Sequence, residues 1–299
     1  MSFAIRTYGL TKKFQRTSVL NGLYMDVPDG SIYGLVGSNG AGKTTTIKVL
    51  MNILGPTSGR SEVLDADSRK LSPRQFAQIG YVSENQEVPD WMTVGYFLHY
   101  FSQFYPTWDR TLADELVKQF QLPLDRKLRH LSHGMRMKAA LASSLAYRPK
   151  LMVLDEPFTG LDALVRDELI EGFLPRAENT TILISSHDLT EIESFASHIG
   201  YLDRGRLQFS EELDTLSGRF REVFVAFSST PRLPEGLPAS WMQPEVSGSA
   251  VRFIESRFDA ERTPADVRRV FPESGELTVN GMPLRAIFVA LAKSSRTEA

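Results

Sequence analysis

The sequence contains no cysteine, which excludes disulfides, thiolate metal ligands and cysteine nucleophiles and is consistent with a reducing compartment. Nowhere do about 20 apolar residues follow one another, so no segment is expected to cross a bilayer. The first residues, MSFAIRTYGLTKKF, lack the long apolar core of a signal peptide. The net charge of −2 provides no basic field, and we therefore expect no nucleic-acid partner.

What is present is typical of a soluble globular protein. The 299 residues suit one large domain or two ordinary ones, and 42% of them are hydrophobic. Short apolar segments at Ser31–Val36, Ile79–Val82, Leu151–Asp155 and Thr180–Ser185 predict buried strands. Helical segments alternate with these strands, which indicates an α/β fold with a mainly parallel sheet covered on both faces.

The predicted helices of this first part are Lys43–Leu54, Thr93–Phe104, Arg110–Phe120, Gly134–Tyr147, Leu161–Leu174 and Asp188–Ala196. The last of them begins with Asp188 and Glu191, a spacing close to that of a capping box.

The pattern changes near Ser217-Gly218, where we expect a domain boundary. Beyond it the sequence predicts a small α+β appendage with a long loop at Thr230–Gly248, which is rich in proline, glycine and serine. Its predicted strands are Glu222–Phe227 and Val251–Ile254, and its predicted helices are Pro264–Val270 and Met282–Lys293.

A glycine-rich segment, GSNGAGKTT, follows the first predicted strand and opens the first predicted helix. It satisfies the pattern G-x-x-x-x-G-K-[ST], whose backbone N–H groups turn inward around phosphates at a helix N-terminus. We expect Lys43 to reach the β- and γ-phosphates and the Thr44 hydroxyl to bind Mg²⁺. The competing interpretation is a chance glycine-rich turn. The predicted phosphate-binding residues are Gly37, Ser38, Asn39, Gly40, Ala41, Gly42, Lys43, Thr44 and Thr45.

Two carboxylates and a histidine follow the ends of two later strands. Asp155 and Glu156 end the strand at 151–155, and ligands collect at strand ends in parallel sheets. Asp155 can hold Mg²⁺ through water, and Glu156 can orient the water that attacks the γ-phosphate and accept its proton. His187 follows the next apolar strand and can contact the γ-phosphate or the water and hold Glu156. Surface charges that close a strand, and a structural histidine, are the alternatives.

The segment Leu131–Met135, LSHGM, lies between the phosphate loop and the carboxylates and has no obvious task in its own subunit. Its position suggests a site that is completed by a second copy of the protein.

The sequence resembles the ATP-binding cassette (ABC) ATPases, the motor subunits of ABC transporters. The resemblance rests on five segments in family order: the phosphate loop, LSHGM, the carboxylate strand, the TGLD segment at 159–162 and His187. The resemblance covers roughly residues 3–215, and other phosphate-loop ATPases lack the LSHGM signature. It implies a P-loop NTPase (RecA-like) domain over residues 1–218, with an antiparallel β subdomain and a helical signature subdomain at about 86–148. Residues 219–299 would form the accessory domain.

The resemblance also implies roles for further residues. Phe14 lies where the family has an aromatic that stacks on adenine, although a plain core phenylalanine is the alternative. Glu84 takes the place of the glutamine that senses Mg²⁺ and the membrane partner, and Gln86 is the alternative sensor. Ser132 and Gly134 match the signature residues that contact the γ-phosphate bound to the opposite subunit.

Three other positions bear on the dimer. Asp162 matches the aspartate of the loop that crosses the dimer interface. His133 stands in place of the first glycine of the signature and Met135 in place of its glutamine, which puts the fine geometry of the trans contact in question.

The expected function is that of an ATP-hydrolysing motor, with ATP and Mg²⁺, for a bacterial exporter of drugs, peptide antibiotics or lipids. Its expected partners are a membrane-spanning permease and a second ABC ATPase subunit, at the cytoplasmic side of the inner membrane. The permease contact is expected near Glu84–Trp91 and the aromatic stretch Tyr96–Trp108, whose aromatics could equally fill a helical core. The alternatives are a non-transport ABC ATPase in translation or DNA repair and a binding-only regulator.

Overall fold

The computed structural model describes residues 2–176 and 180–297. The chain forms two compact units, Met1–Ser210 and Glu211–Ala299. The division falls after Ser210, and the sequence pattern predicts a boundary near Gly218. Helix α7 (Leu213–Arg219) accounts for the difference, because it belongs to the second unit.

A six-stranded sheet forms the centre of the first unit, in the order β10-β9-β3-β8-β7-β6. Its neighbouring pairs from β6 to β9 are parallel. Strands β7 and β8 are buried along their whole length, as expected for parallel strands covered on both faces. The strands are β3 (Ile32–Val36), β6 (Ile79–Ser83), β7 (Leu151–Asp155), β8 (Thr181–Ser186), β9 (His198–Asp203) and β10 (Arg206–Glu212).

A second, four-stranded sheet has the order β2-β1-β4-β5 and antiparallel pairing. Its strands are β1 (Phe3–Phe14), β2 (Thr17–Pro28), β4 (Ser58–Val63) and β5 (Ala66–Asp67). Leu23 of this sheet, Ile47 of helix α1 (Lys43–Leu50) and Leu183 of β8 belong to one buried cluster, so the two sheets share a core. This sheet is the antiparallel subdomain that the family resemblance implied.

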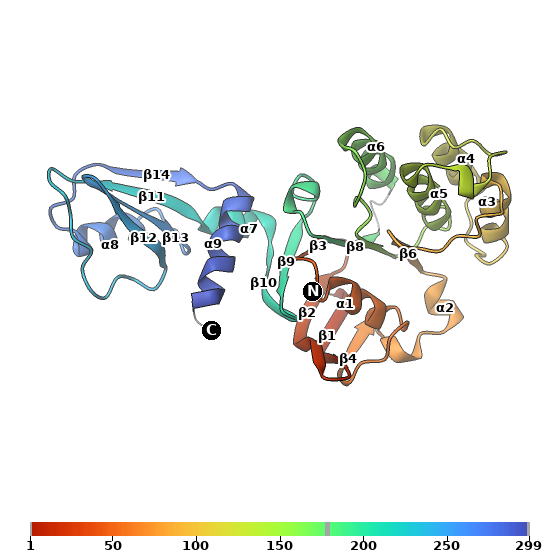
Figure 1. Ribbon diagram of the computed structural model, residues 1–299, viewed down its shortest axis with the longest axis horizontal. Coiled ribbons are helices and arrows are strands. Elements are labelled where there is room, and N and C mark those ends of the chain that lie inside the picture. Colours follow the sequence, from red (N-terminus) through yellow and green to blue (C-terminus); the bar gives the residue numbers. More distant parts are fainter. Residues whose placement is uncertain (1, 177–179, 298–299) are drawn as a thin grey trace. The chain divides into compact units, whose positions relative to one another are not determined.

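The remaining helices of the first unit are α2 (Pro73–Phe76), α3 (Val94–Ser102), α4 (Arg110–Gln119), α5 (His133–Leu145) and α6 (Ala163–Phe173). Helices α3 to α5 stand together beside β6, whereas β1, β2 and β4 lie with α1 (Figure 1). The side chains of Thr93, Asp109, Ser132 and Asp162 each accept a backbone N–H three residues on and so begin their helices. Among the described residues, no helix is both long and apolar enough to cross a membrane.

The second unit is built on an antiparallel sheet with the order β12-β13-β11-β14. Trp241 stacks on Phe253 at 4.0 Å between ring centroids inside its core. The strands are β11 (Arg221–Ala226), β12 (Trp241–Ser247), β13 (Ala250–Glu255) and β14 (Leu277–Gly281), and the helices after α7 are α8 (Arg262–Val270) and α9 (Leu284–Thr297).

The prediction of a helix at Asp188–Ala196 is wrong. The segment holds only a short 3₁₀ turn, Leu189–Glu191, followed by irregular turns. The Ser186 hydroxyl oxygen accepts the backbone N–H of Asp188, and its one proton is shared between the Asp188 carbonyl and the Glu191 carboxylate. These local side-chain bonds compete with a helical start and leave no capping box.

Two further expectations differ from the structure. The loop expected at Thr230–Gly248 contains strand β12, an edge strand that carries Pro244 beside a bulge. Proline is tolerated there because an edge strand needs fewer ladder hydrogen bonds. Helix α1 ends at Leu50 rather than Leu54, because Asn52 takes a left-handed conformation with φ 56°.

Candidate active site

The glycine loop runs from the end of β3 to the start of α1. A Cβ atom at Gly37 would lie 2.3 Å from the Leu202 carbonyl oxygen, so only glycine fits there. Gly40 and Gly42 take φ angles of 83° and 112°, which other residues rarely adopt. The Lys43 ammonium is buried and donates to the carbonyls of Gly37 at 2.6 Å and Ser38 at 3.2 Å. The sequence therefore forces the backbone into a tight turn around one lysine.

A cavity of about 360 Å³, called the phosphate cavity below, opens over this loop. It brings together residues from the glycine loop, the end of β6, the turn after β7 and the end of β8. Its lining consists of Val19, Asn39, Gly40, Gly42, Lys43, Thr44, Thr45, Glu84, Glu156, Thr159 and His187.

Asp155 is held at the floor of the site. It is buried at the end of β7, and its Oδ1 accepts from Thr44 at 3.1 Å and from Ser185 at 2.8 Å. Ser185 lies opposite Asp155 in the parallel β7–β8 register, and its hydroxyl also accepts the backbone N–H of Glu156 at 3.0 Å. One serine hydroxyl therefore fixes the position of both neighbouring acidic residues.

Glu156 projects into the cavity from a left-handed backbone conformation, with φ 53°. Its Oε1 lies 3.1 Å from the Lys43 ammonium. Its Oε2 lies 2.8 Å from Nδ1 of His187 and accepts the Thr159 hydroxyl at 3.1 Å. Since a carboxylate oxygen only accepts, His187 carries its proton on Nδ1. The carboxylate is thus fixed by three side chains from three segments.

The pKa values of the adjacent carboxyl groups of Asp155 and Glu156 shift in opposite directions. Burial raises the pKa of Asp155, and the hydrogen bonds from Ser185 and Thr44 offset this only in part. Burial also acts to raise the pKa of Glu156, but the hydrogen bond from His187 and the Lys43 ammonium outweigh it and lower that pKa. The same hydrogen bond raises the pKa of His187. Glu156 is therefore kept ionised, which suits a group that accepts a proton or orients water.

Among the predicted site residues outside the glycine loop and the strand ends, Phe14, Ser132 and Gly134 are not in the described lining of the phosphate cavity. Ser132 caps α5 by accepting the N–H of Met135 at 3.2 Å. A Cβ atom at Gly134 would lie 2.7 Å from Val165, so α5 and α6 approach closely there. Phe14 is 43% exposed, which contradicts its alternative interpretation as a core residue.

The remaining predicted residues of the glycine loop lie in its turn. Ala41 is buried and its N–H donates to Ser38 at 3.0 Å. Sequence reasoning did not single out Ser185, whose position two residues before His187 on a strand next to β7 was the available signal. The role of Thr159 beside Glu156 was likewise missed, because it depends on the turn in which Thr159 N–H donates to the Glu156 carbonyl.

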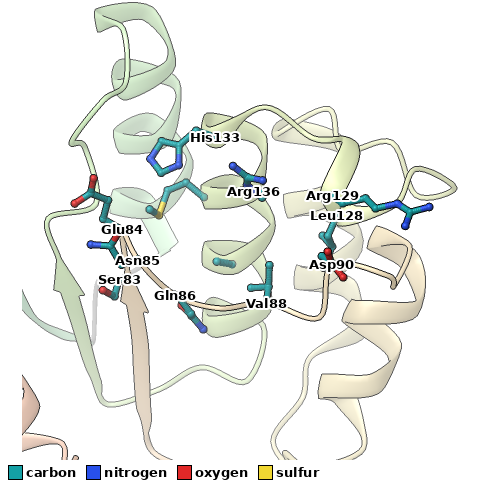
Figure 2. A pocket seen from close by; sticks show the side chains of 12 residues that line it. Ser83, Glu84, Asn85, Gln86, Val88, Asp90, Leu128, Arg129, His133 and Arg136 are labelled. Atoms are coloured by element: carbon teal, nitrogen blue, oxygen red, sulfur yellow. The ribbon is translucent and has the colours of Figure 1, made fainter.

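A second hollow, called the groove below, has a volume of about 280 Å³ and lies between the end of β6 and helix α5. His133 and Glu84 lie at one end of it, and Asp90 and Arg129 at the other (Figure 2). Glu84 lines both the groove and the phosphate cavity. The side-chain oxygen of Gln86, also in the groove lining, is buried without a hydrogen-bond partner among the described residues.

The groups that line the phosphate cavity suit a nucleoside triphosphate with its metal ion. Space is open where a Cβ atom would stand at Gly40, so a phosphate can approach the backbone closely. The oxygens of Thr44 and Asp155 lie 3.1 Å apart, with Glu84 in the same cavity lining as Thr44, and such oxygens are the ligands that Mg²⁺ prefers.

Comparisons with known proteins agree with this chemistry. The sequence model of the ABC transporter family matches residues 20–159. The ABC transporter ATP-binding protein YtrB of Bacillus subtilis is 31% identical over 226 residues, covering 75% of this chain and 77% of YtrB. The bacitracin transport ATP-binding protein BcrA of Bacillus licheniformis is 33% identical over 226 residues, with 74% of each chain covered.

A solved structure of the ATP-binding subunit of an ABC transporter superposes with a TM-score of 0.65 at 25% identity. The match covers 73% of this chain and 92% of that one. The expected fold class is thereby confirmed. This protein belongs to the ABC transporter ATP-binding proteins, the ATP-binding and ATP-hydrolysing subunits of ABC transporters.

Proposed function

We propose that this chain is the motor of a bacterial exporter and that Glu156 is the residue on which its ATP hydrolysis depends. The observation that carries the proposal is the position of the Glu156 carboxylate in the phosphate cavity, 3.1 Å from Lys43 and 2.8 Å from His187. A carboxylate held there can orient a water molecule and accept its proton as the water attacks the γ-phosphate.

The other residues of the cavity divide the remaining tasks. Lys43 stabilises negative charge on the β- and γ-phosphates, while the backbone of the Gly37–Thr45 loop surrounds them. His187 holds Glu156 in place and contacts the γ-phosphate. Thr44, Asp155 and Glu84 would hold Mg²⁺, which would supply positive charge to offset that of the triphosphate. The exposed ring of Phe14 stacks on the adenine.

A second ATPase subunit completes each site. Ser132 and Gly134 begin helix α5, and a helix N-terminus is well suited to an anion. Their absence from the lining of the phosphate cavity in the described chain supports a role toward the nucleotide of the partner. ATP then becomes part of the interface, and its hydrolysis removes charge that holds the two subunits together. Asp162, which caps α6, belongs to the loop at this interface.

The membrane-spanning permease binds at the groove. A row of exposed aromatics begins beside it, with Trp91 58%, Tyr96 49%, Tyr100 41% and Phe104 60% exposed. Trp91 and Tyr96 lie 5.9 Å apart between ring centroids, and such exposed aromatic clusters are typical of protein interfaces. A short helix of the permease would occupy the groove and place this chain at the cytoplasmic face of the inner membrane.

The cargo belongs to the class of drugs, peptide antibiotics or lipids. This assignment rests on the family likeness, in which one relative is named for bacitracin transport. The cargo itself would contact the permease rather than this chain.

The decisive experiment replaces Glu156 by Gln and measures ATP turnover and dimer formation. We expect turnover to fall by about 10²- to 10⁴-fold, because the amide cannot accept a proton, while ATP still stabilises a dimer in size-exclusion chromatography. Glu171→Gln, the same change at an exposed position on α6, is the matched control and should keep normal turnover. Wild-type turnover in the Glu156→Gln variant would refute the role of Glu156.

A further inference from the structure

His133 occupies the signature position at which the resembled family has a glycine, and its ring makes a specific contact. It is the first residue of α5, and its Nε2 lies 3.2 Å from the carbonyl oxygen of Thr159. Because a carbonyl oxygen only accepts, the imidazole carries a proton on Nε2 and donates it to Thr159. The start of helix α5 is thereby tied to the turn that follows β7.

Thr159 connects this contact to the hydrolytic carboxylate. Its hydroxyl donates to Oε2 of Glu156 at 3.1 Å, and its backbone N–H donates to the Glu156 carbonyl at 3.3 Å. Thr159 also lines the phosphate cavity, whereas His133 lines the groove. A single residue therefore receives a hydrogen bond from the groove side and passes one to Glu156 on the cavity side.

The turn needs such an anchor for a physical reason. Glu156 itself sits in a left-handed conformation, and Gly160 follows Thr159 with φ 73°. The ring carbon Cδ2 of His133 lies 4.0 Å from where a Cβ atom at Gly160 would stand, so the imidazole packs beside this part of the turn. Without the ring, the Thr159 carbonyl loses a donor and the turn loses a packing partner.

We propose that His133 is a positioning residue for ATP hydrolysis. Its imidazole anchors the Thr159 carbonyl and thereby holds the Thr159 hydroxyl against the Glu156 carboxylate. The inference rests on the proposed role of Glu156 and extends it to a residue outside the phosphate cavity. His133 directly follows Ser132, which we propose faces the nucleotide of the partner. His133 itself contacts the turn that orients the Glu156 carboxylate of its own subunit.

The test compares steady-state ATP hydrolysis of the full chain with three variants. We expect His133→Ala to lower kcat about tenfold with KM for ATP within about twofold, because orientation of the carboxylate matters mainly in the transition state. His133→Gln can present an N–H at a similar place and should recover kcat to within about twofold of the wild type. His130→Ala, an exposed histidine three residues earlier, is the matched control and should behave as wild type.

A double-mutant cycle separates this route from general loosening of helix α5. Thr159→Val removes the hydroxyl that reaches Glu156, so His133→Ala should lower kcat by less than about twofold in that background. An equal tenfold loss in both backgrounds would overturn the proposal. So would unchanged kcat in His133→Ala, a change confined to KM, or failure of His133→Gln to restore the rate.

The Glu156→Gln variant, measured in the same assay, distinguishes failure of the His133 proposal from failure of the proposed role of Glu156. If Glu156→Gln abolishes turnover and His133→Ala does not lower it, only the role of His133 is refuted. If Glu156→Gln turns over ATP like the wild type, the proposed function of Glu156 fails as well.

Discussion

Nδ1 of His187 lies 2.8 Å from Oε2 of Glu156, across the ends of the adjacent strands β8 and β7. The contact raises the pKa of His187 and contributes to the lowered pKa of Glu156. The carboxylate is largely buried, with 12% of its side chain exposed, whereas the imidazole is 40% exposed. Such a pair is most stabilising where both groups are charged, which makes its contribution depend on pH.

The first prediction concerns that pH window. His187, with a folded pKa above its ordinary 6.5, stabilises the fold fully below pH 6.5 and loses this contribution as pH rises through the folded pKa. Glu156, with a folded pKa below its ordinary 4.5, contributes above pH 4.5 and loses this as pH falls. The pair is therefore most stabilising between pH 4.5 and 6.5.

We expect His187→Ala to reduce the free energy of unfolding by at most about 1 kcal/mol at pH 6, since the imidazole is partly screened by solvent. The difference from the wild type should shrink toward pH 8. Urea unfolding at several pH values measures it, with the exposed histidine of α3, in His99→Ala, as the control. A difference that grows from pH 6 to pH 8 would contradict the assigned pair.

The second prediction concerns Ser185, which bonds both Asp155 and the N–H of Glu156. Ser185→Ala leaves a buried carboxylate and a backbone donor each with one partner fewer, which should destabilise the fold by about 1–3 kcal/mol. It should also raise the Mg²⁺ concentration needed for half-maximal turnover, because Asp155 is then held by one hydroxyl fewer. Urea unfolding and a Mg²⁺ titration of ATPase activity test the two effects. Ser185→Thr keeps the hydroxyl and should retain more of both properties.

Much of the site could be predicted from sequence because its residues lie within short, continuous patterns. The glycine loop and the carboxylate pair each stand at the end of an apolar strand, and parallel strands bring such ends to one edge of a sheet. The hydrogen bonds of Ser185 and Thr159 could not be predicted in this way. Each depends on strand register or on a left-handed turn at Glu156, which no local pattern encodes.

The same reasoning explains the errors in the fold. The segment Asp188–Ala196 has helical composition, but the Ser186 hydroxyl and Asp188 backbone satisfy one another and interrupt the first turn. Strand β12 contains a proline and a bulge, and its sequence therefore predicts a loop. Both features are tolerated because the strand lies at an edge of the sheet. In the first case local side-chain bonds override helical composition, and in the second the edge position of the strand does.

The third prediction concerns Lys43, whose ammonium meets Glu156 and two loop carbonyls. Lys43→Ala removes the charge expected to stabilise the β- and γ-phosphates, so ATP affinity should fall at least about tenfold. Equilibrium binding of a fluorescent ATP analogue measures this, and Lys70→Ala, at an exposed position, is the control. Unchanged affinity would mean that the phosphates bind elsewhere.

The last prediction tests whether the signature segment acts on the partner. Ser132→Arg should abolish turnover, because a bulky side chain at the start of α5 blocks closure over the γ-phosphate of the other subunit. The affinity of the isolated monomer for ATP should remain within about threefold of the wild type, because Ser132 faces the nucleotide of the partner. A threefold change corresponds to a binding free energy of about 0.6 kcal/mol.

Loss of the N-cap is a separate effect of the same substitution, worth about 1 kcal/mol of stability. Ser132→Asp keeps a capping acceptor for the Met135 N–H but places a negative charge toward the phosphate. It should therefore preserve the unfolding midpoint while still blocking turnover and ATP-dependent dimerisation. If either variant loses nucleotide binding as a monomer, the segment acts on the nucleotide of its own subunit, because a residue that faces only the partner cannot alter that affinity.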